Sequence, residues 1–188
     1  MKKAWYGFVL LYALIVLLPY TVTGQHLVPS EKDSKVEFRV NYHKNGNESV
    51  KGRFSNIKGD ITFDPKQPGK SSFDISINAA SINTGIPERD KALKNEQFFN
   101  HSLYPVIHLK STSVAADGPG GIIYVLHGDL TIKGITKPVN VQFTATPMGT
   151  GYLFRGSFHL DRMDYKLGEK GDIDNDVSLF IEVKTIKK

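Results

Sequence analysis

Three aspartates alternate with other residues near the C-terminus, and carboxylates at such a spacing are candidate calcium ligands. They are Asp172, Asp174 and Asp176. A calcium loop of the EF-hand type needs a glycine at its sixth position and a bidentate glutamate at its twelfth. Counted from Asp172, those two positions hold Val177 and Val183. The pattern therefore favours an acidic turn before a final strand over a metal site.

The histidines are a second set of candidate ligands or general bases, but their order in the sequence favours neither role. They are His26, His43, His101, His108, His127 and His159, and no two of them have the spacing of a metal site. A site assembled in space from distant strands stays open. The chain has no Gly-x-Ser-x-Gly nucleophile motif, and no phosphate-binding lysine follows the glycines at 118–121. We therefore expect a binding protein rather than an enzyme, without metal or catalytic residues.

A charged pair, Arg89-Asp90, has two interpretations. It follows Pro87, a residue favoured in the first turn of a helix. The pair would either anchor a short helix through charge-assisted hydrogen bonds or place Arg89 at the polar head of a ligand. We favour the structural role, because ion-paired arginines near a helix start commonly fix local geometry. Two rings, Phe98 and Phe99, follow, and they predict a lid in which at least one ring contacts the ligand.

The elements that must position these residues appear as short runs of alternating apolar and polar residues. The runs cover residues 36–42, 57–63, 73–77, 106–110, 124–132, 139–145, 152–160 and 177–183. Alternation with a period of two indicates strands with one buried face, and glycine- and proline-rich turns separate them. Such a series of strands fits a sandwich or an up-and-down barrel, and the alternation alone does not separate these two folds.

The first 24 residues are expected to be a secretory signal peptide. Lys2 and Lys3 precede an apolar run over residues 8–18, and small residues ending at Gly24 offer a cleavage site. The run is shorter than the about 20 residues that span a bilayer, although an uncleaved anchor is the alternative. Residues 25–188 would then form a single domain, either periplasmic or secreted. The chain has no cysteine, so core packing rather than disulfides must stabilise an exported form.

The charge distribution gives no reason to expect a nucleic-acid partner. The formal net charge is +5, and most basic residues stand singly among acidic ones. The one local cluster is Lys184, Lys187 and Lys188 at the C-terminus, which is typical of a solvated tail. We therefore expect no binding of nucleic acid.

Three blocks of the sequence resemble the YceI-like family of secreted, lipocalin-like proteins that bind polyisoprenoid lipids. The first block lies within residues 81–111, where Arg89-Asp90, Phe98-Phe99-Asn100 and Tyr104-Pro105 carry the resemblance. The second is residues 128–139, and the third and weakest is residues 162–168. The blocks occur in the order of the family. The chain departs from the family at its first strand, where Asp33-Ser34 replaces His-Ser and Tyr42 replaces a closing histidine.

The resemblance implies an all-β fold, an eight-stranded antiparallel lipocalin-like barrel with one short helix inserted between strands. It also implies that an isoprenoid lipid or quinone is bound, stored or transported in the lumen, with no other cofactor. The alternative is a barrel filled by side chains that acts as an interaction module through a protein partner. A homodimer and a transient contact with a membrane surface both stay open. The residues expected to bind the ligand are Val36, Phe38, Val40, Ile61, Phe63, Ile75, Ile77, Arg89, Leu93, Phe98, Phe99, Ile107, Leu109 and Phe158.

Overall fold

The structure is a computed structural model, and it describes residues 24–44, 46, 48–118, 120 and 122–188. The expected signal peptide therefore lies outside the described residues, except for Gly24. The strands are β1 (Gln25–Pro29), β2 (Lys35–Tyr42), β3 (Glu48–Phe54), β4 (Ile57–Phe63), β5 (Ser72–Asn78), β6 (Val106–Asp117), β7 (Ile123–Ile132), β8 (Ile135–Met148), β9 (Gly151–Asp161) and β10 (Asp176–Lys187). The helices are α1 (Pro87–Lys94) and the short 3-10 segments η1 (Pro68–Lys70), η2 (Ala79–Ser81) and η3 (Arg162–Tyr165).

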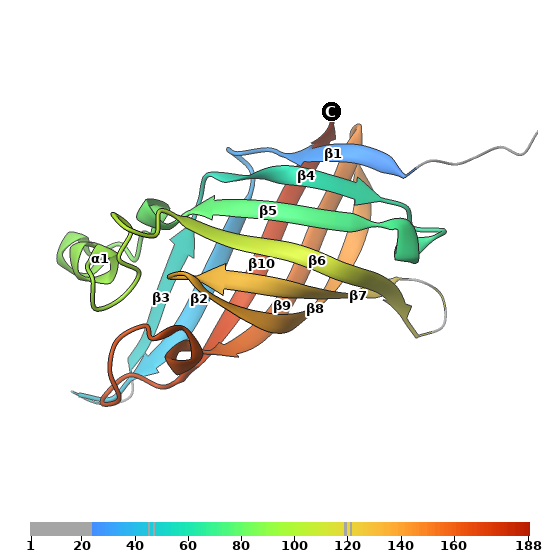
Figure 1. Cartoon of the computed structure of the whole chain (residues 1–188). Helices are drawn as coiled ribbons and strands as arrows, with labels where there is room; N and C mark the ends of the chain where they lie inside the picture. The colour runs from blue at the N-terminus through green and yellow to red at the C-terminus, as the bar shows by residue number, and fades with distance from the viewer. Residues whose placement is uncertain (1–23, 45, 47, 119, 121) are drawn as a thin grey trace, which may run out of the picture.

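Eight of the strands close into an antiparallel barrel (Figure 1). The order around the ring is β1, β4, β5, β6, β7, β8, β9 and β10, and β1 pairs with β10 to close it. The pairing of β1 with both β4 and β10 closes the ring, which removes most of the exposed edge along which another strand could add. The expected fold, an eight-stranded antiparallel barrel with one short helix, is confirmed.

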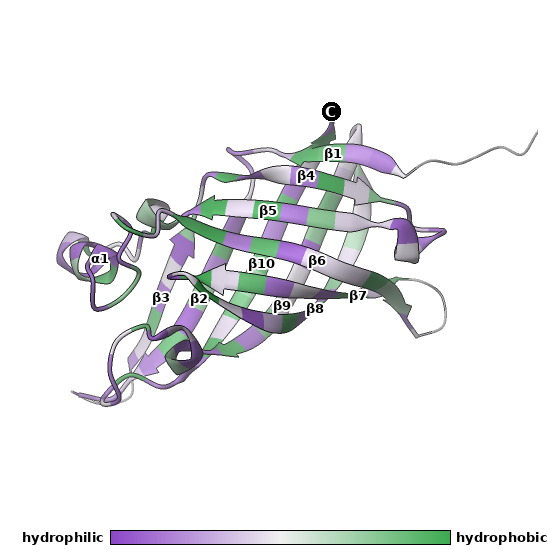
Figure 2. Ribbon diagram, in the orientation of Figure 1, coloured by the Kyte–Doolittle hydropathy of each residue, from purple (hydrophilic) through white to green (hydrophobic). Residues whose placement is uncertain are grey.

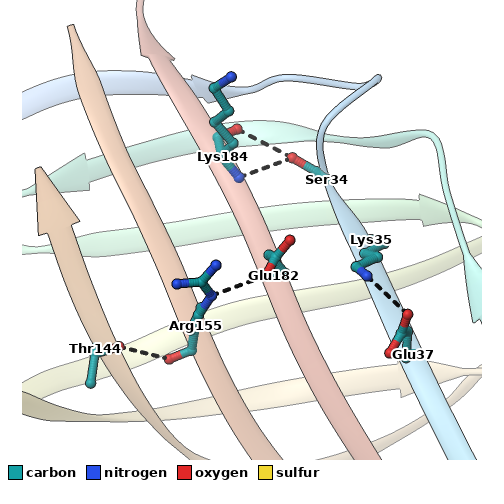
Figure 3. Close-up of polar contacts among 7 residues, drawn as sticks. All are labelled: Ser34, Lys35, Glu37, Thr144, Arg155, Glu182 and Lys184. Atoms are coloured by element: carbon teal, nitrogen blue, oxygen red, sulfur yellow. Dashed lines mark hydrogen bonds and ion pairs between the residues drawn. The ribbon is translucent and has the colours of Figure 1, made fainter. Parts of the chain in front are cut away.

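The strands β2 and β3 form a hairpin beside the ring, and β3 was not expected from the sequence. The strand β2 pairs with β10 next to the segment that pairs with β1. Between these two pairings, the Ser34 hydroxyl lies 3.2 Å from both the carbonyl oxygen and the amide nitrogen of Lys184 (Figure 3). The Ser34 side chain thus provides the hydrogen bonds to β10 in the gap between the part of β10 that pairs with β1 and the part that pairs with β2. On the outer face, the ion pair Lys35–Glu37 lies within β2, and the ion pair Arg155–Glu182 joins β9 to β10 (Figure 3).

Hydrophobic and hydrophilic residues alternate along the strands (Figure 2), and the hydrophobic ones line the interior of the barrel. In β10, for example, Leu179 and Ile181 face the interior, whereas Phe180 lies on the outer face under the guanidinium of Arg39, 4.8 Å from the ring centroid. Successive side chains of a strand point to opposite faces, so a regular alternation is sufficient to build this partition. Two groups of buried apolar residues result, one toward each end of the barrel.

The helix α1, the one α-helix among the described residues, lies at one end of the barrel, at the left of Figure 1. It begins at Pro87, as the sequence predicted, because proline has no backbone N–H to lose in the first turn and its φ angle already suits a helix. The helix has only eight residues and no buried side chain of its own. Its position therefore depends on hydrogen bonds at its start and on partly buried residues such as Leu93, which packs against the apolar core at this end of the barrel. None of the described helices is long and apolar enough to cross a membrane.

Candidate ligand cavity

An apolar cavity of about 450 Å³ extends from the end of the barrel near α1 inward to the rings of Phe73, Phe143 and Phe154. Its wall consists of the interior faces of the strands, completed by residues of α1 and of the segments that follow α1 and η3. The sequence-predicted residues that line it are Val36, Phe38, Val40, Ile61, Ile75, Ile77, Arg89, Leu93, Phe98, Phe99, Ile107, Leu109 and Phe158. The structure therefore brings together, around one hollow, residues as distant in the sequence as Val36 and Phe158.

Phe63 is the exception among the predicted residues, because it does not line the cavity. Its ring is 1% exposed and makes edge contacts with the rings of several neighbours. The partners are Phe73, Tyr124, Phe143, Tyr152 and Phe154, at centroid distances of 5.1–6.4 Å. This ring cluster fills the barrel at the end away from α1. Alternation correctly placed Phe63 in the interior, but it carries no information on the position of a residue along the barrel axis.

Several cavity residues were not predicted. Val50 and Phe54 come from β3, where Gly52 interrupts the apolar face that they share. A side chain at Gly52 would collide with the Phe38 ring, which explains why the strand has a glycine there. Apolar residues at alternate positions in residues 48–54 were the available signal. Ile173, by contrast, stands in an acidic turn, and no sequence signal indicates that it faces the cavity.

Residues around Thr84 anchor the start of α1. The Asp90 carboxylate accepts hydrogen bonds from the Thr84 amide at 2.7 Å and from the Thr84 hydroxyl at 2.6 Å. The Arg89 guanidinium donates to the Thr84 hydroxyl through Nε at 3.0 Å and to the Thr84 carbonyl through Nη2 at 3.2 Å. Arg89 and Asp90 thus hold the same threonine and do not pair with each other. Arg89 also reaches the cavity wall, so both roles considered for it are compatible with its position.

The segment of residues 166–175, here called the second cover, completes the cavity wall at the same end. It is held by Arg162, whose side chain is 4% exposed. The guanidinium donates to the carbonyl oxygens of Leu167, Glu169, Ile173 and Asp174 at 2.7–2.9 Å. Burial lowers the pKa of Arg162 from its ordinary value, and the nearby Asp161 carboxylate opposes this shift. A single buried cation therefore organises the whole segment through backbone acceptors.

The second cover meets the segment of residues 95–99, here called the first cover, above the cavity. The Gly168 amide donates to the Gln97 carbonyl at 2.9 Å. The Lys133 ammonium donates to the carbonyls of Lys166 at 3.0 Å and Gln97 at 3.4 Å, and thus contacts both covers. Desolvation by burial lowers the pKa of Lys133, with smaller effects from its charged neighbours. The expected lid is therefore one half of a two-part cover.

The aspartates of the acidic turn do not form a common site, because Asp174 and Asp176 contact different partners. Asp174 accepts from Asn41 at 2.9 Å and lies 2.7 Å from His43 Nε2, and its pKa is lowered chiefly by the hydrogen bonds with His43 and Asn41. Asp176 instead lies 2.9 Å from His159 Nδ1. These pairs connect the second cover and β10 to neighbouring strands on the outside of the barrel. In the part of the chain that the structure describes, no group of three or more His, Asp or Glu residues is arranged to hold a metal ion.

The cavity wall supplies apolar surface and few polar groups. Among the described residues that line it, the polar side chains are Tyr42, Arg89 and Arg162, and none is a carboxylate, a histidine or a serine. A lining of this kind binds through the removal of apolar surface from water, while a small number of polar groups orient the ligand. The site is therefore suited to hold an apolar chain rather than to activate a nucleophile.

A closed antiparallel barrel with an apolar cavity at one end defines the lipocalin-like class of small binding proteins. Residues 28–185 match the family model of the YceI-like domain, and the chain belongs to this family. A UPF0312 protein of Pseudomonas aeruginosa is 33% identical over 160 residues, which cover 81% of each chain.

Two solved structures show the same fold. BcnA of Burkholderia cenocepacia matches 82% of this chain and 98% of its own, with a TM-score of 0.74 and 24% identity. A domain from Saccharophagus degradans, described as a polyisoprenoid binding domain implicated in plant cell wall breakdown, matches 88% of this chain and 99% of its own. Its TM-score is 0.66 and its identity 13%. The fold is therefore shared with proteins of widely different sequence.

Proposed function

We propose that this protein binds a long isoprenoid lipid, a polyprenyl chain or an isoprenoid quinone, in the cavity beneath the two covers. The observation that carries the proposal is the apolar cavity of about 450 Å³, which the strand interiors and both covers line together. Membership of the YceI-like family and the polyisoprenoid binding described for the structural relative support the choice of ligand class. The role is binding for storage or transport, without a chemical reaction.

The physical basis of binding is the burial of hydrocarbon. Each methylene removed from water contributes about 0.8 kcal/mol, so a chain of several isoprene units binds without specific hydrogen bonds. The polar end of such a lipid remains near the mouth, where partly exposed side chains such as Arg89 and Tyr42 lie. A carrier of this type would shield an insoluble chain in an aqueous compartment.

Lipid extraction followed by mass spectrometry tests the proposal directly. Protein purified without detergent from its native host should release an isoprenoid in roughly equal molar amount. The absence of lipid, together with no displacement of a neutral apolar fluorophore, would instead favour the filled-barrel interaction module. The observation that supports this alternative is the ring cluster around Phe63, whose side chains fill one end of the barrel.

A pair of neighbouring substitutions tests the location of the site. Leu179→Trp adds volume to the cavity wall, whereas Phe180→Trp adds it to the outer face of the same strand. We expect weaker binding of the fluorophore in the first variant and unchanged binding in the second. If both variants changed fluorophore binding equally, the fluorophore would bind outside this cavity.

We also propose that the protein is exported, so that the carrier acts in the periplasm or outside the cell. The support is the sequence pattern of residues 1–24, with its basic start and short apolar run. N-terminal sequencing of the protein from its native host should give a chain that begins near Gln25. A chain that retains Met1 would contradict cleavage.

A further inference from the structure

Exposed apolar side chains gather at the end of the barrel opposite α1, here called the closed end. It consists of the β4–β5, β6–β7 and β8–β9 connections, together with the start of β1 and the end of β10 (Figure 1). Its exposed large apolar residues are Ile122, Ile123, Met148 and Ile186. Ile122 is the most prominent, with an exposed fraction of 72%. Apolar side chains that gather in this way on a surface indicate a contact with another body.

The lysines of the closed end are exposed and free of carboxylate partners. Lys66 and Lys70 lie in the β4–β5 connection, and Lys187 is the last residue of β10. None of the three forms an ion pair with another described residue. The Lys187 amide donates to the Thr150 hydroxyl at 3.4 Å, so this lysine lies beside the β8–β9 turn rather than in a solvated tail. The positive charges and the apolar side chains therefore share one surface.

The few carboxylates near these lysines are already engaged. Asp64 is buried and accepts two backbone amides of its own turn. Asp117 accepts from the Gln142 side-chain amide at 2.9 Å, and Asp60 pairs with Lys188 at 2.6 Å. The three connections contain no other acidic residue. The closed end therefore has an excess of positive charge.

The end near α1 also exposes apolar side chains, but its charges differ. Leu103, for example, has an exposed fraction of 65%. Several exposed carboxylates belong to this end: Glu88, Glu96, Asp164, Glu169 and Asp172. These carboxylates offset the lysines of the same end. Apolar exposure is thus common to both ends, and the excess of positive charge distinguishes the closed end.

We propose that the closed end docks on the surface of a membrane that contains anionic lipids. The lysines lie among the phosphate groups, while the side chains of Ile122 and Met148 enter the boundary between head groups and acyl chains. Charge attraction and hydrocarbon burial are each weak here, and their combination gives reversible binding. The surface lies away from the cavity, so the proposal goes beyond the proposed function and does not depend on a ligand. In this orientation both covers face the aqueous phase.

Vesicle sedimentation tests the docking. Protein purified without detergent from its native host is mixed with sucrose-loaded vesicles, either of phosphatidylcholine alone or of phosphatidylcholine and phosphatidylglycerol in equal parts. We expect about a hundredfold tighter binding to the mixed vesicles, because each of three lysines near an anionic surface contributes about fivefold. This preference should decrease as the sodium chloride concentration rises, because the lysines are exposed.

Matched sets of lysine substitutions locate the surface. The first set combines the unpaired lysines of the closed end: Lys66→Gln, Lys70→Gln and Lys187→Gln. It should remove the preference for the mixed vesicles. The control set removes the same charge from exposed lysines outside the closed end: Lys44→Gln, Lys51→Gln and Lys91→Gln. It should retain most of the preference, because charges more than about 10 Å from the lipid surface are largely screened.

Two tryptophan substitutions report the orientation. The one tryptophan of the chain, Trp5, lies in the expected signal peptide. In Ile122→Trp, the fluorescence emission should shift to shorter wavelength on mixed vesicles, because indole rings favour the membrane interface. In Leu103→Trp, at the end near α1, the emission should stay that of the free protein.

Each outcome decides the proposal. A preference for mixed vesicles that disappears in the first lysine set and survives in the control set supports it. Equal binding to both kinds of vesicle overturns it, as do equal losses in the two sets or an emission shift in Leu103→Trp alone. Binding to soluble polyglutamate without binding to vesicles would assign the surface to an acidic protein and overturn it as well. The proposed function stays unaffected, because no isoprenoid takes part in the assay.

Discussion

The backbone N–H of Gly168 donates a 2.9 Å hydrogen bond to the carbonyl oxygen of Gln97, and this bond joins the two covers above the cavity. The Phe98 ring lies directly against the same glycine: a Cβ atom added at Gly168 would lie 2.7 Å from Phe98 Cε1. Gly168 also has a φ angle of +76°, a conformation that other residues adopt at a cost. The junction of the covers therefore depends on the absence of a side chain at this position.

Gly168→Ala is expected to open this junction. The new methyl group must displace the Phe98 ring, and the positive φ angle costs about 1–2 kcal/mol in addition. Stopped-flow dilution should show faster release of a bound apolar fluorophore. Gly149→Ala is the matched control, because Gly149 has a φ angle of +59° and a methyl group there would meet no atom within 4 Å beyond its chain neighbours. The Gly149→Ala variant should lose about the same stability through its backbone conformation and retain the wild-type release rate.

The two adjacent rings of the first cover are expected to respond differently to truncation. The Phe99 ring packs edge-on against Phe54, with centroids 5.4 Å apart, whereas Phe98 contacts Gly168 at the junction of the covers. Phe99→Ala should therefore lower the free energy of unfolding, by less than the about 3–5 kcal/mol of a fully buried ring. Phe98→Ala should mainly accelerate ligand release. Denaturant midpoints and release rates that change equally in both variants would contradict this division of roles.

Arg162→Met is expected to release the second cover. The substitution removes the donors of four backbone carbonyls, and each carbonyl left buried without a partner costs about 1–3 kcal/mol. Amide hydrogen exchange should rise within residues 166–175, with a loss of stability of about 3 kcal/mol or more. Arg155→Met is the control, because its ion pair with Glu182 is exposed and should contribute at most about 1 kcal/mol. Undiminished protection of the second cover in Arg162→Met would argue against this role.

Alkaline pH is expected to destabilise the protein through Tyr165. Burial, with a smaller effect of Asp164, raises the pKa of this phenol from 10.0 to about 12. The folded state therefore favours the neutral phenol. This contribution is complete below pH 10.0 and is lost as the pH rises from there through about 12. A shift of this size corresponds to about 2–3 kcal/mol.

Urea unfolding at about pH 9 and about pH 12 checks this expectation, with Tyr165→Phe as the comparison. Phenylalanine keeps the ring and has no proton to lose, so the variant should lose less stability over this interval than the wild-type protein. Parallel losses in the two proteins would show that other groups cause the alkaline unfolding.

Much of the fold and of the cavity wall could be predicted from local sequence patterns. Alternation identifies the interior face of a strand wherever it is regular, as it is for Val36, Phe38 and Val40 in β2. Pro87 marks the helix start because its backbone geometry and missing N–H suit that position. The strand β3 was missed because Gly52 interrupts its apolar face, and β1 was missed because its pattern is short.

The sequence by itself determined which residues point inward in the strands with regular alternation, where the helix begins and that the chain forms an all-β fold. These properties depend on the chemistry of neighbouring residues and on the geometry of one strand or one helical turn. Only the tertiary structure decided that Phe63 fills the closed end, that Arg162 holds a second cover and that Gly168 meets Gln97. These contacts exist only because β1 and β10 close the ring and because each residue lies at a particular position along the barrel axis. Both arise from pairing between residues that are distant in the sequence, which leaves no trace in a local pattern.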